Sequence, residues 1–518
     1  MGEGVKKMSK KLIKVMNTSF RDGLQSVFGA RVLTKDFLPA FEAAIDAGMY
    51  HFEVGGGARF QSLYFYCNED AFDMMSTLRS MAGSDIKLQI VARGVYAQSM
   101  EPESSDVINL HNKLYKKHGA DIIRNFDALN DYRNLEYASK STIDNGLGNE
   151  LVITMMELPP GCKGAHDVAF YRRILVDFLE AKIPYTSICF KDASGSSDPN
   201  KVYETIKMAR DILPKDTELR FHTHETAGCS VACYLAALNG GVDAIDLAMA
   251  PVSGGTAQPD ILTMMHALKD TDFDLGFDIN KILKAEKVFQ ECLKDYFVPP
   301  ESGAVNPLIP ISPMPGGALT ANTQMMRDND LMEKYPAVIR AMSDVVSKGG
   351  YGTSVTPLSQ FYFQQAFNNV MFGLWKRIAK GYGKMVLGCY GKTPVEPDKD
   401  VVKIAAEQLG IEPTTKQVLD TCDKDPNKGL DVAKKVLQDN NIEETEENLF
   451  VVATCGDKGV WFLKGNAKIN IRKSVNNTDF KEPKGYTVKV DGNEYGVVID
   501  GGTAVVNGKK YSVDVGLN

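Results

Sequence analysis

The feature that most constrains this chain is a repeating alternation in its first 255 residues. Short apolar runs, often β-branched, end at polar residues or glycine, and longer segments with helical spacing separate them. The pattern predicts eight strands, at residues 14–20, 51–56, 88–93, 122–126, 151–157, 185–191, 218–224 and 244–250. Strands that are each followed by a helix and buried on both faces are typical of a parallel sheet. Eight such units in about 250 residues predict an α/β fold, the closed (β/α)8 or TIM barrel.

The main alternative to a closed barrel is an open, doubly wound parallel sheet. That fold would carry a glycine-rich dinucleotide-binding turn directly after its first strand. The segment at this point reads TSFRDGLQ and is not such a turn, so the sequence favours the barrel. In a barrel the carboxyl ends of the strands form one face where active sites are built, and residues far apart in the chain become neighbours there.

The chain beyond residue 270 has a different pattern. Helical spacing dominates up to about residue 470, at 279–297, 360–383, 400–410 and 430–439 for example, with Pro-Gly segments between. Residues 485–515 carry three turn signals, Asp-Gly, Asp-Gly-Gly and Asn-Gly, between alternating runs, which predicts a small β-hairpin module. We therefore predict a barrel domain (1–300), an all-helical domain (301–470) and a β-rich tail (471–518).

Charge and composition exclude several classes of function. Lys and Arg number 59 against 66 Asp and Glu, a net charge of −7 without a basic block, which argues against nucleic-acid binding. No apolar run approaches the roughly 18 residues of a membrane span, and the first 16 residues contain no apolar signal-peptide core. The nine cysteines form no C-x-x-C pair, which is typical of reduced thiols in a cytoplasm. The sequence predicts a cytoplasmic protein without a nucleic-acid partner.

Polar side chains gather where the predicted strands end, and two histidines are the most specific of them. These polar residues are Asp22, Arg93, Asp127, Lys191, His222 and His224. His222 and His224 alternate on one strand, so both imidazoles face the same way. Together with the carboxylate of Asp22 they would suit a divalent metal ion. The alternatives are two hydrogen-bonded core histidines, and an Asp22 that caps the following helix.

Lys191 and Arg93 each have more than one interpretation. Lys191 could form a Schiff base in an aldolase-like barrel, pair with Asp192, or, after adding CO2, bind a metal as an anionic carbamate. A free ammonium group, with a pKa of about 10.4, would instead repel the ion. Arg93 ends the third strand and would either hold a substrate carboxylate or form a salt bridge with an acid at the barrel rim.

Thr356 and Gln25 also have both a structural and a chemical interpretation. Thr356 precedes Pro357, which predicts a helix start with Thr356 at the N-cap. A hydroxyl held at such a fixed point could also transfer a proton. Gln25 could donate an amide hydrogen to a ligand, or simply begin a helix.

Nine separated motifs make the chain resemble the carboxyltransferase family of biotin-dependent enzymes over residues 12–470. The motifs are TSFRDGLQS (18–26), CNED (67–70), ARG (92–94), RNFDALND (124–131), FKDASG (190–195), HTHETAG (222–228), MPGGALTAN (314–322), VTPLSQ (355–360) and VLGCYGKTP (386–394). The family includes the carboxyltransferase part of pyruvate carboxylase, the alpha subunit of oxaloacetate decarboxylase and a subunit of transcarboxylase. The chain is similar to the separate B subunit of two-subunit pyruvate carboxylases and to its oxaloacetate decarboxylase relatives.

This resemblance implies a barrel with a helical funnel, usually dimeric, that moves a carboxyl group between carboxybiotin and pyruvate or oxaloacetate. The metal, zinc, manganese or cobalt, would be bound by Asp22, His222, His224 and a carbamylated, catalytic Lys191. Arg93 and Gln25 would hold the 2-oxo acid. Thr356 would shuttle the proton between pyruvate and biotin, and Ser359 would lie in the biotin pocket.

The resemblance also implies partners: a biotin carboxyl carrier domain, a biotin carboxylase subunit and, for a decarboxylase, membrane subunits that couple the reaction to sodium. The chain has no A-M-K-M biotinylation motif, because the nearest string, around Lys207, falls in a predicted barrel helix. The tail resembles the segment that precedes a biotinyl domain, which is expected beyond this chain or on another. Two positions depart from the family pattern, where Tyr96 and Met100 replace the usual Asn and Tyr.

Three other functions remain open at this point. A 2-oxoglutarate carboxylase subunit would be a close variant of the same enzyme. A metal-dependent aldol lyase of the 3-hydroxy-3-methylglutaryl-CoA lyase type would share RDGLQ and H-x-H, but such enzymes tend to lack the lysine of FKDASG and the long helical domain. A non-catalytic scaffold would have no need of the complete set of ligand residues with Arg93 and Thr356.

Overall fold

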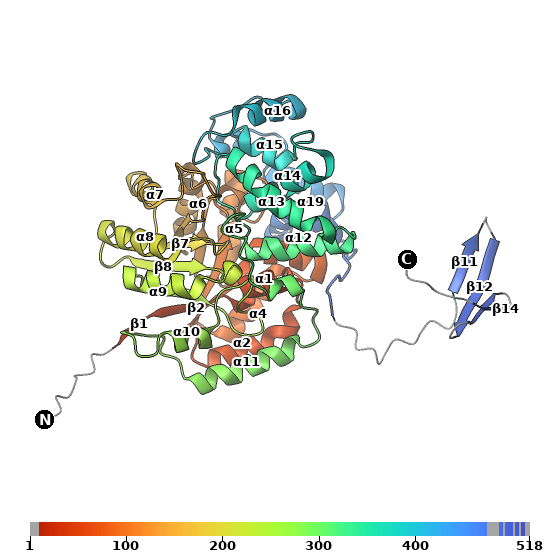
Figure 1. The fold of residues 1–518 in the computed structure, drawn as a ribbon, viewed down its shortest axis with the longest axis horizontal. Coiled ribbons are helices and arrows are strands. Elements are labelled where there is room, and N and C mark those ends of the chain that lie inside the picture. Colours follow the sequence, from red (N-terminus) through yellow and green to blue (C-terminus); the bar gives the residue numbers. More distant parts are fainter. Residues whose placement is uncertain (1–9, 474–485, 491–492, 501–502, 507–508, 513–518) are drawn as a thin grey trace. The chain divides into compact units, whose positions relative to one another are not determined.

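The structure, a computed structural model, divides the chain into two compact units. It describes residues 10–473, 486–490, 493–500, 503–506 and 509–512. Met1–Arg472 form the first unit and Lys473–Asn518 form the second. The barrel and the helical region after it therefore belong to one unit (Figure 1).

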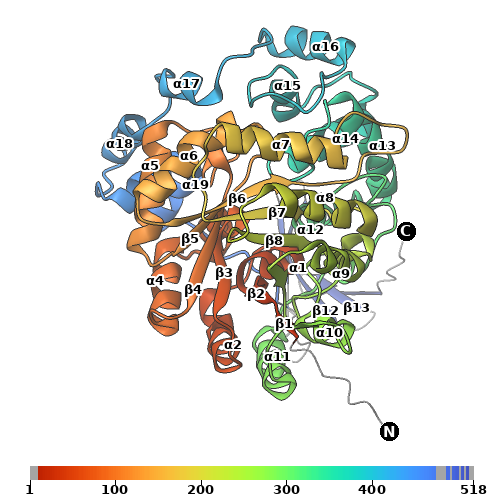
Figure 2. The same cartoon turned by 90° about the vertical axis from the view of Figure 1, so that its left-hand side faces the viewer.

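Eight parallel strands close into a barrel, which confirms the predicted fold class (Figure 2). In order they are β2 Lys14–Asn17, β3 His51–Gly56, β4 Lys87–Ala92, β5 Ile122–Asn125, β6 Gly148–Thr154, β7 Ser187–Asp192, β8 Glu218–Thr223 and β9 Ala244–Leu247. β9 pairs with β2 and completes the ring. The first strand is shorter than the predicted 14–20, because Ser19–Gly23 wind into a π-helical turn that carries Asp22.

Helices cover the barrel and then form the rest of the first unit. The first group is α1 Leu24–Phe28, α2 Thr34–Asp46, α3 Gly57–Ser62, α4 Ala71–Ala82, α5 Ser105–Lys117, α6 Arg133–Asp144, α7 Val168–Glu180, α8 Pro199–Ile212, α9 Ser230–Gly240, α10 Ile261–Ala267 and α11 Ile279–Leu293. The second group is α12 Gly316–Asp328, α13 Tyr335–Lys348, α14 Leu358–Phe372, α15 Lys380–Val386, α16 Lys399–Leu409, α17 Val418–Asp423, α18 Leu430–Asp439 and α19 Glu446–Leu463. Lys207 lies within α8, as expected.

Two details differ from the predicted helical region. The stretch 360–383 is not one helix, because Gly373 adopts a positive φ of 100° and ends α14. The last helix, α19, returns to the barrel, where the ring of Phe450 packs edge-on against Phe60 with 5.5 Å between centroids. A short parallel pair, β1 Lys11–Leu12 with β10 Phe273–Asp274, lies outside the barrel ring.

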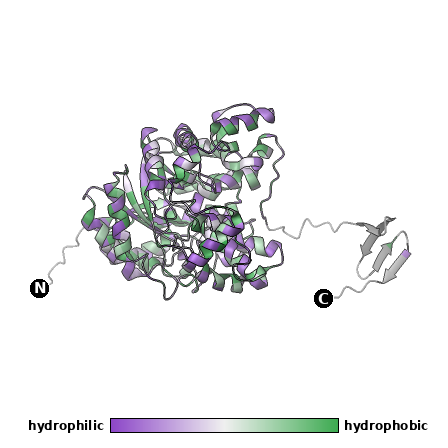
Figure 3. Ribbon diagram, turned by 90° about the horizontal axis from the view of Figure 1, so that it is seen from above, coloured by the Kyte–Doolittle hydropathy of each residue, from purple (hydrophilic) through white to green (hydrophobic). Residues whose placement is uncertain are grey.

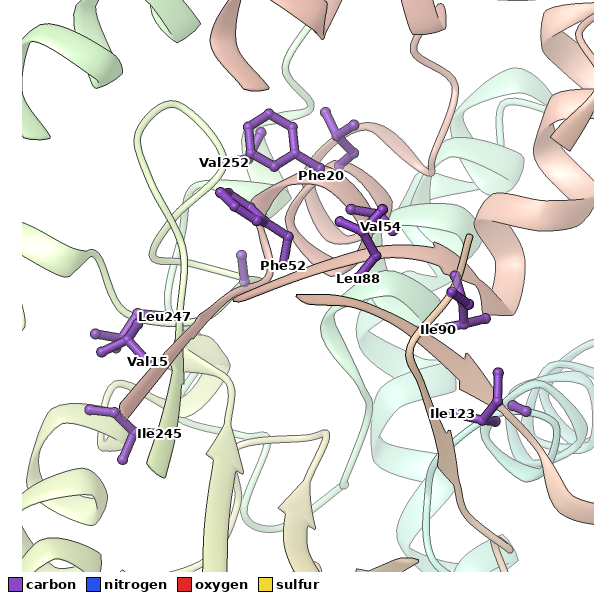
Figure 4. Close-up of a cluster of buried hydrophobic side chains, with 14 of the residues drawn as sticks. Val15, Phe20, Phe52, Val54, Leu88, Ile90, Ile123, Ile245, Leu247 and Val252 are labelled. Carbon is purple, nitrogen blue, oxygen red and sulfur yellow. The ribbon is translucent and has the colours of Figure 1, made fainter. Parts of the chain in front are cut away.

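The two faces of the barrel strands have opposite character. Figure 4 shows apolar side chains on and beside the strands: Val15, Phe52, Val54, Leu88, Ile90, Ile123, Ile245 and Leu247. They face the helices, since Phe52 packs against Phe41 of α2 with 4.9 Å between ring centroids. The helices are two-sided as well, with hydrophilic and hydrophobic residues alternating along each ribbon (Figure 3). An apolar layer between strands and helices therefore forms the core around the barrel.

The inner face of the barrel is charged, which the sequence analysis did not anticipate. Arg124 Nη1 lies 2.7 Å from Asp246 Oδ2, and Arg124 Nε contacts Glu150. Arg220 Nε lies 2.9 Å from Glu150 Oε2, and its Nη1 lies 3.0 Å from Asp246 Oδ1. All four side chains are fully buried, so each charge depends on the others for compensation.

The second unit is a four-stranded antiparallel sheet, in the order β11 Tyr486–Val490, β12 Asn493–Asp500, β13 Thr503–Val506 and β14 Lys509–Ser512. These strands agree with the predicted hairpins, and the glycines of the three predicted turns lie outside the described residues. Among the helices that the structure describes, none is long and apolar enough to cross a bilayer.

We expect Arg124→Met to lower the free energy of unfolding by about 3–5 kcal/mol, because it leaves Asp246 and Glu150 buried with one partner fewer. Urea denaturation followed by circular dichroism measures the loss. Lys140→Met is the matched control, since the Lys140–Asp144 pair is exposed (72% and 60%) and contributes little. Equal denaturation midpoints for the two variants would show that Asp246 and Glu150 do not depend on Arg124 for compensation of their charges.

Candidate active site

Three side chains from two parts of the chain converge at the mouth of the barrel. Asp22 lies in the turn after β2, His222 lies in β8 and His224 follows that strand directly. Asp22 Oδ2 is 3.5 Å from His222 Nε2 and 3.4 Å from His224 Nε2, and all three residues are buried. A tetrahedral site with metal–ligand bonds of about 2.1 Å has ligand atoms about 3.4 Å apart. The type of these donors and their spacing therefore fit a divalent ion.

Each imidazole is oriented by a second hydrogen bond at Nδ1. His222 Nδ1 lies 2.8 Å from Asp246 Oδ2, and His224 Nδ1 lies 2.7 Å from the carbonyl oxygen of Thr256. Both partners are acceptors, so Nδ1 carries the hydrogen and Nε2 presents its lone pair beside Asp22. Burial, followed by the nearby charge of Lys191, holds the pKa of His222 well below its usual range. His222 is therefore neutral, which is the form that binds metal.

Asp22 is held in its ionised form by the polar and charged groups around it. Burial by itself would raise the pKa of Asp22, but Arg21, His224 and Lys191 together hold it well below its usual range. Arg21 Nη1 lies 3.1 Å from Asp22 Oδ1, and Arg21 Nε donates to Glu53 at 2.8 Å. Arg21 thus occupies one carboxylate oxygen and leaves Oδ2 facing the histidines. Asp22 makes no helix-capping hydrogen bond to α1, so the capping interpretation is wrong.

Lys191 lies beside this cluster. Its Nζ is 3.7 Å from Asp22 Oδ2, and only 4% of its side chain is exposed. Burial lowers the pKa of Lys191, against the attraction of Asp22 and with the help of Arg21. A lowered pKa increases the fraction of free amine, which is the form that can add CO2. Asp192 accepts hydrogen bonds within its own loop, so Asp22 and not Asp192 is the acid that faces Lys191.

Two adjoining cavities open next to this cluster. The inner cavity, about 40 Å³, is lined by Asp22, His224 and the neighbouring Lys191, among other residues. The outer cavity, about 480 Å³, lies between the barrel mouth and helices α12 and α14. Three of the predicted site residues line both cavities and so form the wall between them: Gln25, Arg93 and Thr356.

Arg93 is a buried cation without an acidic partner. Its Nη1 donates to the carbonyl oxygens of Gln98 and Ser99 at 2.9 and 3.0 Å. Burial, together with the charge of Arg21, lowers the pKa of Arg93 to about 10. In the part of the chain that the structure describes, Arg93 forms no salt bridge, so the interpretation as a rim ion pair is wrong.

Thr356 does not cap the helix that follows it. Helix α14 begins at Leu358 and Pro357 occupies the N-cap position, so the predicted cap is wrong. In the described residues the Thr356 hydroxyl makes no hydrogen bond, which leaves it available to a molecule in either cavity. Ser359, the second residue of α14, lines the outer cavity, and in the described residues its buried Oγ has no hydrogen-bond partner.

Gln25 is both helical and part of the cavity wall. It is the second residue of α1, and its Oε1 accepts a hydrogen bond from the backbone of Ala58 at 3.2 Å. Of the two positions that depart from the family pattern, Met100 lines the outer cavity, whereas Tyr96 packs against the ring of Tyr390, 5.9 Å away.

Asp127 lies at a strand end but does not join the cluster. Its carboxylate accepts hydrogen bonds from the backbone of Leu129 and Asp131, both at 3.0 Å. Burial, followed by the nearby Asp131, raises the pKa of Asp127 to about 7. Asp127 therefore fixes the loop after β5 and faces neither cavity.

Sequence analysis missed the residues that orient the metal ligands: Arg21, Glu53, Asp246 and Gln258. Glu53 and Asp246 alternate with apolar residues on their strands, so a period-two pattern of polar residues could have indicated them. The sequence Arg220-x-His222-x-His224 shows the same period, extended beyond the strand end. Gln258 lies in an irregular loop after β9 and gives no such signal.

Comparison with known proteins identifies the class of this enzyme. Residues 102–289 match the HMGL-like family, and residues 309–500 match the family described as Conserved carboxylase domain. The B subunit of pyruvate carboxylase from Methanocaldococcus jannaschii is 29% identical over 494 residues, which cover 94% of this chain and 84% of the relative. Methylmalonyl-CoA carboxyltransferase 5S subunit of Propionibacterium freudenreichii is 28% identical over 400 residues, 77% of this chain and 78% of the relative.

A solved structure shares the fold. The carboxyl transferase domain from Rhizobium etli pyruvate carboxylase superposes with a TM-score of 0.79 at 20% identity, covering 98% of this chain and 89% of that domain. The barrel with a metal-ligand cluster at its mouth defines a class of α/β-barrel enzymes that act at the carboxyl ends of the strands. Within that class, the chain is similar over most of its length to the carboxyltransferase subunits of biotin-dependent enzymes, in agreement with the predicted family.

We expect Asp246→Asn to weaken the binding of Zn²⁺ by about 10–100-fold, because the amide no longer fixes the tautomer and orientation of His222. Metal competition against a chelating indicator measures the affinity without turnover. Glu286→Gln is the control, since Glu286 is a buried carboxylate on α11, outside the cluster. An unchanged Zn²⁺ affinity in Asp246→Asn would show that His222 keeps its orientation without this hydrogen bond.

Proposed function

We propose that this chain moves a carboxyl group between carboxybiotin and pyruvate, forming or consuming oxaloacetate. It would act as the B subunit of a pyruvate carboxylase or as the alpha subunit of an oxaloacetate decarboxylase. One observation carries the proposal: Arg93 and Thr356 line both cavities. A 2-oxo acid in the inner cavity and a biotin ring in the outer cavity would therefore meet at the same wall, as a transfer between two bound molecules requires.

Four residues would hold the metal, which we propose to be zinc, manganese or cobalt. A bound divalent ion supplies positive charge that stabilises the enolate oxygen of the 2-oxo acid. Asp22, His222 and His224 offer one oxygen and two nitrogen donors, a set that suits these metals. Lys191 would join them as a carbamate, because its buried amine has a lowered pKa and lies beside Asp22.

The cavity wall would bind the substrate and move the proton. Arg93 would bind the carboxylate of the 2-oxo acid as a bidentate pair, which gives its buried charge the partner it lacks. Gln25 would donate a hydrogen bond to the same molecule. The Thr356 hydroxyl would take a proton from the methyl carbon of pyruvate and pass one to the biotin ring nitrogen. Ser359, with its free hydroxyl, would contact biotin in the outer cavity.

The size of the inner cavity favours pyruvate over 2-oxoglutarate. Its volume of about 40 Å³ has room for roughly three water molecules, which suits a three-carbon acid. 2-Oxoglutarate already carries a second carboxylate, so its carboxylation product would carry three, and Arg21, the cation nearest to Asp22, is already paired with Asp22 and Glu53.

The proposed reaction requires partners that deliver biotin. A biotin carboxyl carrier domain, beyond this chain or on another, would place its biotin in the outer cavity, and a biotin carboxylase subunit would load it. An oxaloacetate decarboxylase would add membrane subunits. The homodimer and the cytoplasmic location stay predictions.

Thr356→Ala tests the proton transfer. We expect oxaloacetate decarboxylation with free biotin to fall by about 100-fold or more, because the hydroxyl that carries the proton is gone. Thr356→Ser should retain most of the activity, and a chelator should abolish the activity of the wild type. Equal turnover by the wild type and Thr356→Ala would refute the proton-shuttle role.

Arg93→Met tests the binding of the substrate carboxylate. We expect the KM for oxaloacetate to rise about 10–100-fold, because the charged hydrogen bonds to that carboxylate are lost. The metal content, measured by elemental analysis, should stay that of the wild type, since Arg93 contacts no metal-ligand residue. An unchanged KM would exclude Arg93 as the carboxylate-binding group.

A further inference from the structure

The side chain of Gln258 completes a tetrahedron with the three metal-ligand residues. Gln258 is fully buried, and its Nε2 lies 2.9 Å from His224 Nε2, 3.2 Å from Asp22 Oδ2 and 3.4 Å from His222 Nε2. The two separations from Asp22 to the histidines are 3.4 and 3.5 Å. These five edges place the amide terminus of Gln258 at a fourth corner, not at the centre. The centre of such a tetrahedron is about 2.0 Å from each corner, a normal metal–ligand distance.

The hydrogen bonds of Thr18 allow the Gln258 amide two orientations. Thr18 Oγ1 lies 2.6 Å from Gln258 Oε1 and 3.1 Å from the carbonyl oxygen of Leu247. A hydroxyl has one hydrogen and can donate to only one of these two acceptors. If the amide turns over, its NH2 group donates to Thr18, and the Thr18 hydrogen is left for Leu247. The Leu247 carbonyl oxygen accepts a hydrogen bond from the backbone N–H of Thr18 at 2.9 Å in either case. Both orientations therefore satisfy Thr18, and in the second the amide oxygen occupies the fourth corner.

The two orientations suit two states of the centre. With NH2 at the corner, the amide donates to Asp22 and His224, which satisfies these groups when no cation lies between them. With the oxygen at the corner, the amide presents a lone pair to a cation held by the same residues. The amide oxygen and nitrogen are nearly equal in size, so the exchange requires no other movement.

We propose that Gln258 is a further ligand of the metal centre, and that its amide turns over when the ion binds. Its oxygen joins Asp22, His222 and His224, and Thr18 is the positioning residue that receives the NH2 group. The inference rests on the proposed function only in requiring a divalent ion at this centre. It has a consequence of its own: four ligands are present before Lys191 is carbamylated, so the ion binds without CO2.

Binding of Co²⁺ to the purified full chain in CO2-free buffer tests this inference, with competition against a chelating indicator as the measurement. We expect Gln258→Met to weaken Co²⁺ binding tenfold or more and to change the visible absorption spectrum of bound Co²⁺. Thr18→Val should weaken binding severalfold. Gln324→Met, at a buried glutamine of α12 without a hydrogen bond to the ligand residues, is the matched control and should bind like the wild type.

Co²⁺ binding that is unchanged or tighter in Gln258→Met would overturn the inference. If the Gln258 amide were only a hydrogen-bond donor to the metal-free ligands, its removal would leave Co²⁺ binding equal or tighter, because nothing would have to be displaced. If Gln258→Met does not fold, Gln258→Asn replaces it in the same binding experiment. The asparagine side chain is one methylene shorter, so its amide oxygen does not reach the fourth corner and Co²⁺ binding should also weaken. Wild-type protein that binds Co²⁺ no more tightly than Gln258→Met, or that binds Co²⁺ only after bicarbonate is added, refutes this inference alone. Wild-type protein that binds no divalent ion with or without bicarbonate refutes the metal-dependent function as well.

Discussion

The contact between Arg124 and Asp246, deep in the barrel, is the interaction on which the active site depends. Asp246 accepts hydrogen bonds from Arg124 and from His222 Nδ1 with the same oxygen, Oδ2. The position of this carboxylate therefore sets the orientation of His222, one of the proposed metal ligands. Buried ion pairs contribute little net stability, since the cost of desolvation offsets their attraction. An apolar interior of the same shape would hold the barrel together equally well, but it would not fix an imidazole.

The barrel alone does not make the site. Arg93 comes from the end of a barrel strand, whereas Thr356 and Ser359 come from the start of α14, more than 250 positions later in the chain. The wall between the two cavities exists only where these segments meet. This explains why the helical region packs into the same unit as the barrel, and why α19 adds Phe450 to the apolar core around it. A loosely attached helical domain would leave the two cavities without a fixed common wall.

The sequence predicts those parts of the molecule that follow from periodicity. The eight strands recur with buried apolar residues and intervening helices, and a barrel then brings His222, His224, Lys191 and Asp22 to one face. Periodicity cannot place residues in irregular segments, and the π-helical turn that carries Asp22 and the loop that carries Gln258 are of this kind. Periodicity also does not show that the residues on the inner face of the strands are charged and form ion pairs across the barrel. The predicted N-cap at Thr356 fails for a local reason, since Pro357 occupies that position itself.

The charges around the inner cavity explain why the site suits one carboxylate better than two. Arg21 and Arg93 are balanced by Asp22 and Glu53, so the protein alone is close to neutral there, apart from Lys191. A divalent ion adds two positive charges, and a carbamate on Lys191 together with one substrate carboxylate would cancel them. Oxaloacetate carries a second carboxylate and would leave one negative charge uncompensated in a buried site, which is costly. The electrostatics thus favour the release of oxaloacetate once it has formed.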